Sequence, residues 1–465
     1  MFGRSLTKSS DFSIGEQRSL FGHARRIKEV VKTESGGYSA DDAASSANGG
    51  ASVASLLGFG DKGHCATDTF RMSGGKNGNN GCVYLVFIEN STRTKESFRN
   101  AAAFHGCKVC DFDCATSSLS KGETLTDTIK MLVGYSERQT SFIIRSKWEG
   151  VCTWLDWAIG EKFCRVHDIP RPSFINAGDG QHEHPSQELL DDFTFLEHQD
   201  WKFDSIHVAL IGDLWHGRTV HSKADGLRIF GDVKVDLIAP DELQMPDEYV
   251  KKMQDNGFTV EKYKSIDAYL ASKKCATIWY FTRLQLERMS DEVQKKSADL
   301  RKAVTFSLEK HQSELPEGAK FYHPLPRDSR NPVIPFEVDS TPLNGWDTQS
   351  RNGYFVRTAL LGMVGGHLAV DVEEEMEDVD DAEVEGCANG GEQAESAGNG
   401  GVATNNKREQ MLSILRQGPP VTATGKCKHP ACVSHVDNGQ REVLQWIVDG
   451  KCVYCDHPIQ FSKTC

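Results

Sequence analysis

The 465-residue sequence contains no apolar run approaching the roughly 20 residues that a membrane-spanning helix needs. It also lacks an excess of positive charge, since its formal net charge is −13. These two absences argue against membrane and nucleic-acid partners. The N-terminal residues have no apolar core of the secretory type, so we expect a cytoplasmic protein. The fourteen cysteines are then expected to stay reduced.

The negative charge is concentrated in one segment. Residues 371–395 hold twelve acidic residues and neither Lys nor Arg, and the residues from there to 406 are rich in Gly and Asn. Such a composition cannot bury enough apolar surface to fold, so 371–406 is predicted to be an acidic linker. Residues 407–465 then form a separate module that is too small to rely on a hydrophobic core alone.

Upstream of the linker, short apolar runs alternate with helical patterns. This alternation predicts two α/β domains, each with a parallel sheet covered by helices on both faces. An amphipathic helix is expected at 10–33, followed by a flexible, Gly- and Ser-rich insertion at 34–81. The expected strands are 82–89, 108–112, 141–145 and 173–176 in the first domain, and 206–212, 235–239 and 276–280 in the second.

A candidate phosphate site follows the first expected strand, where a helix begins with Ser91, Thr92, Arg93 and Thr94. The free backbone N–H groups and the positive end of the helix dipole attract an anion, and the hydroxyls and the forked guanidinium add directed donors. Taken alone, a Ser/Thr run before a helix is more often an ordinary N-cap.

Six motifs, beginning with that one, resemble those of the carbamoyltransferase family and occur in the family's order. They are STRTKESF (91–98), SSLSKGETLTDTI (117–129), INAGDGQHEHPSQELLDDFT (175–194), ALIGDLWHGRTVHS (209–222), FTRLQLERM (281–289) and FYHPLPRDSR (321–330). The resemblance implies a domain binding carbamoyl phosphate (1–33 and 82–200), a domain binding the amino acid (201–345) and a C-terminal helix returning to the first domain (346–370).

The resemblance also implies which residues bind carbamoyl phosphate. These are Ser91, Thr92, Arg93, Thr94, Ser117, Lys121, Arg145, His184, Gln187, Leu325 and Pro326. Thr94 and His184 would polarise the carbonyl oxygen, and the backbone carbonyl of Leu325 would orient the carbamoyl amide. The family usually has His-Pro after its arginine, whereas Ser-Lys follows Arg145 here.

By the same resemblance, Lys121, Arg218, Arg283 and Gln285 bind the amino-acid substrate, and Arg93, Thr94, Lys121 and His184 are the catalytic residues. In the family the loop with Ser117 and Lys121 belongs to a neighbouring subunit's site, so a homo-trimer with shared sites is expected. Arg288 and Arg357 are expected to be supporting residues with structural roles. No metal or nucleophilic side chain is expected at the reaction centre, where positioning and electrostatics suffice.

L-Aspartate is the expected amino substrate, which would make the reaction the committed step of pyrimidine biosynthesis. Arg218, Arg283 and Gln285 suit a dicarboxylate. The sequence has His-Pro-Leu-Pro at 323–326 and no Ser-Met-Gly, whereas ornithine-specific members typically show His-Cys-Leu-Pro and Ser-Met-Gly. An ornithine or other carbamoyltransferase remains the alternative, and an inactive scaffold that binds nucleic acid through the C-terminal module is a second one.

Two cysteine pairs near the C-terminus predict what stabilises the last module. Cys427 and Cys432 form C-x4-C, and Cys452 and Cys455 form C-x2-C. Four thiolates in two close pairs suit a closed, tetrahedral structural zinc site, whose binding can fold a small module outright. Two disulfides are the alternative, but they conflict with a cytoplasmic location. The stretch resembles the zinc domain of the aspartate carbamoyltransferase regulatory chain, which implies a fusion of the two chains.

Overall fold

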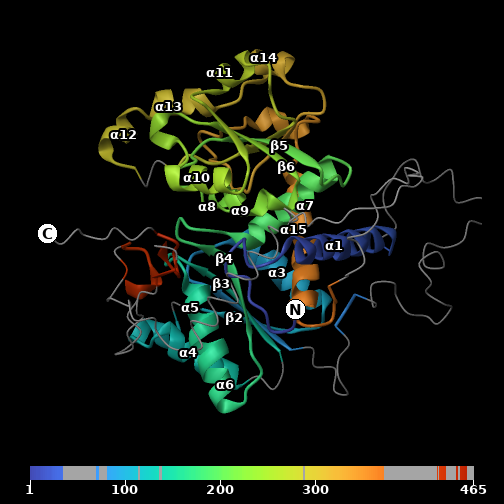
Figure 1. Cartoon of the computed structure of the whole chain (residues 1–465), viewed down its shortest axis with the longest axis vertical. Coiled ribbons are helices and arrows are strands. Elements are labelled where there is room, and N and C mark those ends of the chain that lie inside the picture. Colours follow the sequence, from blue (N-terminus) through green and yellow to red (C-terminus); the bar gives the residue numbers. More distant parts are fainter. Residues whose placement is uncertain are drawn as a thin grey trace, which may run out of the picture.

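The computed structural model describes residues 1–34, 70–72, 81–113, 116–135, 139–285, 289–370, 427, 429–435, 447–448 and 451–457. Within them the chain forms two parallel-sheet α/β domains, which lie one above the other in Figure 1. The prediction of this fold class is confirmed. Among the described residues, no helix is both long and apolar enough to cross a lipid bilayer.

The sheet of the first domain has four parallel strands in the order β2-β1-β3-β4. Its strands are β1 (Cys82–Phe87), β2 (Lys108–Phe112), β3 (Thr140–Ser146) and β4 (Ser173–Asp179). The helices between them are α3 (Thr92–Phe104), α4 (Leu125–Gly134), α5 (Val151–Leu155) and α6 (Cys164–His167), with a π-helical segment at Asp156–Phe163. Strands β3 and β4 are almost wholly buried, as expected for a sheet covered on both faces.

The sheet of the second domain has five parallel strands in the order β7-β6-β5-β8-β9. They are β5 (Ser205–Ile211), β6 (Asp232–Ile238), β7 (Thr259–Tyr263), β8 (Ile278–Phe281) and β9 (Lys320–Tyr322). The helices of this domain are α8 (Arg218–His221), α9 (Lys223–Gly226), α10 (Asp247–Asp255), α11 (Ile266–Ala271), α12 (Asp291–Lys295), α13 (Ser297–Val304) and α14 (Leu308–His311).

Three long helices join the domains: α1 (Ile14–Glu34), α7 (Pro185–His198) and α15 (Trp346–Val364). α15 contacts α1, α3 and α7, so the chain returns to the first domain after completing the second (Figure 1). Apolar residues of all four helices belong to one continuous core that also includes the second sheet. This core fixes both domains around the space between them.

The described part of the C-terminal module packs against the first domain. Its cysteines, Val433, Val453 and Tyr454 share one apolar cluster with α4 and α5. The backbone of Glu149 pairs with it on both sides, since Glu149 N–H donates to Ala431 O at 2.8 Å and Glu149 O accepts from Val433 N–H at 2.9 Å. Gly150, with φ +78°, has no room for a side chain, because a Cβ would lie 2.5 Å from Tyr454.

The expected elements differ from the structure in a few places. β7 and β9 were not predicted, because β7 (TVEKY) carries little apolar signal and β9 has three residues. In the predicted insertion 34–81, two of the described residues are packed, with Phe70 in the core and Met72 against Cys107. The linker 371–406 lies outside the described residues.

Candidate active site

A cavity of about 840 Å³ opens between the two domains. It is lined by Arg145 near the end of β3, by the segments that follow β1 and β4 of the first sheet and β5, β8 and β9 of the second, and by residues of α7 and α15. Ligands of open parallel sheets bind at these carboxyl ends, where loops and helix starts converge. Five arginines but a single acidic residue, Glu89, line the cavity within the described part of the chain. It therefore suits an anionic ligand.

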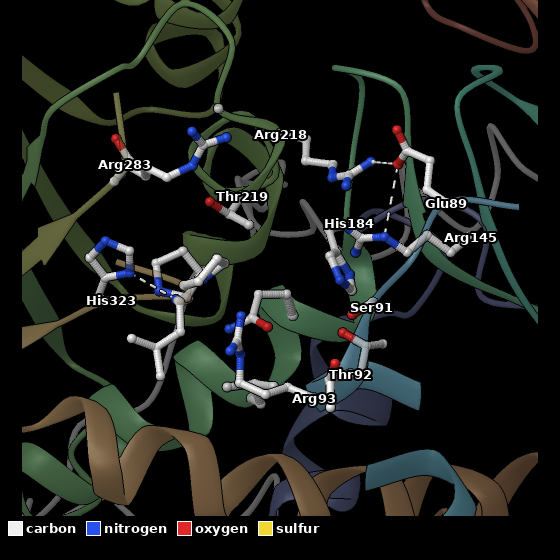
Figure 2. A pocket seen from close by; sticks show the side chains of 18 of the residues that line it. Glu89, Ser91, Thr92, Arg93, Arg145, His184, Arg218, Thr219, Arg283 and His323 are labelled. Carbon is white, nitrogen blue, oxygen red and sulfur yellow. Dashed lines mark hydrogen bonds and ion pairs between the residues drawn. The ribbon is translucent and has the colours of Figure 1, made fainter. Parts of the chain in front are cut away.

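The start of α3 forms one wall of this cavity, with Ser91, Thr92, Arg93 and Thr94 all lining it. Ser91 precedes the helix in extended conformation, and its side chain makes no capping hydrogen bond. The ordinary N-cap interpretation therefore does not describe Ser91. The side chains of Ser91, Thr92 and Arg93 lie together on this side of the cavity (Figure 2), at the end of α3 where free backbone N–H groups favour an anion.

Two arginines from different domains meet at Glu89 (Figure 2). Arg218 Nη1 lies 3.1 Å from Glu89 Oε2, and Arg145 Nε lies 3.8 Å from the same oxygen. Gly178 has φ +110°, and a Cβ there would lie 3.1 Å from the Arg218 guanidinium. The absence of a side chain at this position lets both guanidiniums approach the end of β4.

His184 and Gln187 stand at the start of α7, beside these arginines. His184 N–H donates to Ser222 Oγ at 2.9 Å, and its Nδ1 lies 3.4 Å from Ser186 Oγ. Burial, with help from Arg145 and Arg218, lowers the pKa of His184 well below its usual value. The imidazole is therefore neutral and able to donate one hydrogen bond. Gln187 Nε2 donates to the buried Asp191 at 2.9 Å, which fixes the amide.

The loop after β9 closes the other side of the cavity. Leu325 has φ +53° and precedes a cis Pro326, while its N–H donates to His323 Nδ1 at 2.7 Å. Burial, and the charges of Arg327, Arg93 and Arg283, lower the pKa of His323 to about 3. A neutral His323 thus accepts the Leu325 N–H and holds the loop in this unusual conformation.

A buried Asp213 organises the segments that follow β5 and β8. Its carboxylate accepts hydrogen bonds from His216 and, at 3.1 Å, from the backbone N–H of Gln285. Gln285 Nε2 in turn donates to His216 O at 3.1 Å. These contacts hold Gln285 in the wall of the cavity, where Arg218 and Arg283 also lie.

The structure brings together most of the residues predicted from the motifs. Ser91, Thr92, Arg93, Thr94, Arg145, His184, Gln187, Arg218, Arg283, Gln285, Leu325 and Pro326 all line the cavity. Ser117 and Lys121 do not: Lys121 ends a short 3₁₀ helix (Ser118–Lys121), and its side chain is exposed. Arg288 lies outside the described residues.

Several cavity residues were not predicted, namely Glu89, His216, Thr219, Thr282, His323 and Gln349. Five of them lie within or beside the motifs, so the sequence could have indicated them, but no role was assigned to them. Gln349 lies on α15, far from the other residues in sequence. Only the packing of α15 against α7 brings it to the cavity.

The four cysteines of the C-terminal module form a compact cluster. Their sulfurs all lie within 4.8 Å of one another, and Cys427 and Cys455 are 3.8 Å apart, as Cys432 and Cys452 are 3.9 Å apart. A tetrahedron with Zn–S bonds of about 2.3 Å has edges of about 3.8 Å. The thiols are free, so they do not form the alternative pair of disulfides. The donor set and its spacing fit a zinc ion.

The sequence has known relatives. Residues 64–197 match a family described as Aspartate/ornithine carbamoyltransferase, carbamoyl-P binding domain. The aspartate carbamoyltransferase catalytic subunit of Aliivibrio fischeri is 35% identical over 287 residues, covering 61% of this chain and 85% of that subunit. The chain belongs to the aspartate carbamoyltransferase family.

Two proteins named PyrBI are more similar in sequence than that member of the aspartate carbamoyltransferase family. Those of Treponema denticola and Thermotoga maritima are 49% and 50% identical over 369 residues. These residues are 79% of this chain but 62% and 63% of the two proteins. The chain therefore spans less than two thirds of their length.

Solved structures of an aspartate transcarbamoylase from Trypanosoma cruzi share the fold. The complex with N-(phosphonacetyl)-L-aspartic acid is 28% identical and has a TM-score of 0.59, covering 77% of this chain and 95% of that one. The complex with carbamoyl phosphate and aspartate is 27% identical, with a TM-score of 0.58 and the same coverage.

Proposed function

We propose that this protein transfers the carbamoyl group of carbamoyl phosphate to L-aspartate, giving N-carbamoyl-L-aspartate and phosphate. One observation carries the proposal: a single cavity collects Ser91–Thr94, Arg145 and His184 from one domain and Arg218, Arg283 and Gln285 from the other. The membership of the aspartate carbamoyltransferase family supports the same reaction. The role would be the committed step of pyrimidine biosynthesis, in the cytoplasm.

In the proposed reaction, the aspartate amine attacks the carbonyl carbon, a C–N bond forms and the C–O bond to phosphate breaks. The proton that the amine loses passes to the departing phosphate. Arg93, with the hydroxyls and N–H groups of the first turn of α3, would hold the phosphate and the charge that builds on it. Thr94 and the neutral His184 would donate to the carbonyl oxygen, and the Leu325 carbonyl would orient the carbamoyl amide and the amine.

Arg218, Arg283 and Gln285 would bind the two carboxylates of aspartate. The second domain supplies all three, and the first supplies the phosphate-binding residues 91–94 with Arg145 and His184, so that the domain interface brings the reactants together. Because Glu89 links Arg145 with Arg218 in the present structure, substrate carboxylates would compete with Glu89 for Arg218.

We also propose a homo-trimer with shared sites. In this trimer, Ser117 and Lys121 would belong to the site of a neighbouring subunit. Two observations support this: Lys121 is exposed, and neither residue lines the cavity of its own chain. Mixing inactive Arg93→Ala and Lys121→Ala proteins under exchange conditions should then restore activity at sites that receive both native groups. Demonstrated subunit exchange without any recovery of activity would refute shared sites.

Cys427, Cys432, Cys452 and Cys455 are proposed to hold one structural zinc ion, remote from the reaction centre. We propose the same domain limits as from the sequence: 1–33 with 82–200, 201–345, 346–370, a linker at 371–406 and the zinc module at 407–465. The fit of the sulfur spacing to a zinc tetrahedron supports the metal site.

The proposed activity is tested by assaying the purified full chain for carbamoyl-aspartate formation from labelled carbamoyl phosphate. Ornithine is the matched alternative substrate, because carbamoyl ornithine formation distinguishes the sibling activity. Turnover with aspartate and none with ornithine is expected. Turnover with ornithine, or with neither amino acid, would contradict the proposal.

A further inference from the structure

Arg357 is a buried arginine of α15 that lines the cavity and has no carboxylate partner among the residues that the structure describes. Only 3% of its surface is exposed. Nη1 donates to Ser97 Oγ, whereas Nε and Nη2 are buried without a hydrogen-bond partner among the described residues. Sequence analysis assigned this residue a structural role, but structural arginines in protein interiors are normally paired.

A paired arginine in the same chain shows the contrast. Arg171 Nη2 lies 2.8 and 2.9 Å from the two carboxylate oxygens of Asp156, and Nη1 contacts Glu161. Burial opposes its charge, but both carboxylates overcome that effect and raise the pKa of Arg171. The pKa of Arg357 shifts in the opposite direction, since burial lowers it to about 9.

Asp191, whose negative charge acts on Arg357, already has other partners. Asp191 favours the charged form of Arg357, but no ion pair joins the two within the described chain. Asp191 instead lies 3.0 Å from the ammonium of the fully buried Lys223. Its other oxygen accepts hydrogen bonds from Gln187 at 2.9 Å and Gln349 at 2.7 Å. Within the described part of the chain, no carboxylate therefore pairs with the guanidinium of Arg357.

Its contacts place Arg357 beside the candidate phosphate site. Ser97 lies one turn after the candidate phosphate site at the start of α3. Its hydroxyl accepts a hydrogen bond from Arg357 and donates one to Thr94 O at 3.1 Å. Ser97, Thr94 and Arg357 line one cavity. The field of Arg357 also reaches His184, whose pKa it helps to lower. A buried, uncompensated charge at this place is what an arriving dianion would neutralise.

We propose that Arg357 is a counter-ion of the substrate's phosphate group, supplied to the phosphate site by α15. This inference rests on the proposed function and adds a binding residue to it. The ligand class is a phosphate dianion, either free or as part of carbamoyl phosphate. Bound phosphate would supply the negative charge that the described residues around Arg357 do not provide.

The test compares Arg357→Met with the matched variant Arg171→Met. Melting temperatures are measured without ligand, and binding of inorganic phosphate and of carbamoyl phosphate is measured by calorimetry. Without ligand, Arg357→Met should melt at or above the wild-type temperature, because an uncompensated charge has been removed. It should bind both ligands about 10- to 100-fold more weakly, as expected for a lost charge-assisted contact.

Arg171→Met should do the reverse, with a lower melting temperature and unchanged phosphate affinity. Arg357→Lys keeps the charge and should bind phosphate more tightly than Arg357→Met. In steady-state kinetics, Arg357→Met should raise the KM for carbamoyl phosphate much more than the KM for aspartate, which a general loss of structure would not do.

The outcomes separate this inference from the proposed function. If the wild-type chain binds neither phosphate nor carbamoyl phosphate, the proposed function itself fails. If the wild type binds them and Arg357→Met binds equally well, the counter-ion role is overturned. A melting temperature lowered as far as that of Arg171→Met, or no gain in affinity for Arg357→Lys over Arg357→Met, also overturns it.

Discussion

The cavity and the junction of the cysteine module with the first domain are both rich in charged groups, but they balance their charges differently. In the cavity, five arginines face one glutamate. At the junction, Asp456 lies 2.6 Å from Lys8 Nζ and 3.1 Å from His182 Nε2, and Glu149 lies 3.2 Å from His429 Nδ1. The junction is internally neutralised, whereas the cavity keeps an excess of positive charge.

This difference in charge balance is what we expect between a binding site and a permanent interface. An interface that is always formed gains most when each buried charge has a partner within the protein. A site for anions must leave its cations available, and the burial of those cations makes each one respond strongly to a ligand. Substitutions in the cavity should therefore affect activity more than stability, and substitutions at the junction should do the opposite.

The largest effect is expected from removing the proposed metal. Zinc binding contributes about 10–16 kcal/mol in small zinc-folded peptides, so chelation should unfold the module and expose Tyr454 and Val453. Fluorescence of Trp154, whose ring lies 6.2 Å from that of Tyr454, should report the change. The transferase core should stay active. Metal analysis that finds no zinc in the purified chain would reject the assignment.

Arg93→Ala should nearly abolish turnover without unfolding the protein. Loss of a charge-stabilising donor typically lowers kcat by about 10²–10³, roughly 3–4 kcal/mol. Arg93 makes no ion pair with a described residue, so thermal stability should change little. Arg99→Ala is the matched control on the same helix, because Arg99 is paired with Asp111 at 2.7 Å, outside the cavity. Wild-type activity of Arg93→Ala would eliminate the proposed phosphate site.

Lys8→Met tests the junction. Lys8 is mostly buried and bonds to Asp456 and, at 3.1 Å, to Val453 O, so its loss should destabilise the docked module by about 1.5–3 kcal/mol. Urea unfolding followed through Trp154 measures the change. Lys251→Met removes an exposed pair with Asp255 and should cost about 0.5 kcal/mol or less. Equal effects of the two substitutions would remove the distinction between junction and surface.

Much of the fold and most of the cavity were predictable, because both depend on local patterns. Apolar runs predicted the strands β1 to β6 and β8, and motifs at the ends of strands predicted cavity residues such as Arg93 and His184. Three features depended on long-range packing instead. The edge strand β7 has too few apolar residues to be recognised, Gln349 reaches the cavity only through α15, and the junction joins Lys8 to Asp456 across nearly the whole sequence.

The proposed role of Arg357 illustrates the limit most clearly. In the sequence it lies in a helical run with no distinguishing neighbours, and a structural role was the expectation. Only the structure shows that its guanidinium is buried and that the nearby Asp191 is bound to Lys223. Whether a buried charge is paired depends on side chains from several elements, and a single segment of sequence does not contain that information.

The smallest predicted effect concerns the protonation of the buried His323 beside the cavity. Its pKa of about 3 is lowered first by burial and then by Arg327, Arg93 and Arg283. Between pH 6.5 and 3 the unfolded chain binds a proton at this histidine and the folded chain does not. Stability should therefore fall as the pH decreases, with a contribution from His323 of about 1.4 kcal/mol per pH unit. His323→Asn retains an acceptor for the Leu325 N–H but cannot bind the proton. The contribution of His323 to the pH dependence should therefore disappear, and the unfolding free energy of the variant should fall less steeply between pH 6 and pH 5. His167→Asn, at an exposed position, is the matched substitution of a histidine outside the cavity. An unaltered slope in His323→Asn would mean that His323 takes up its proton in the folded protein, and would contradict a pKa lowered by burial and the nearby arginines.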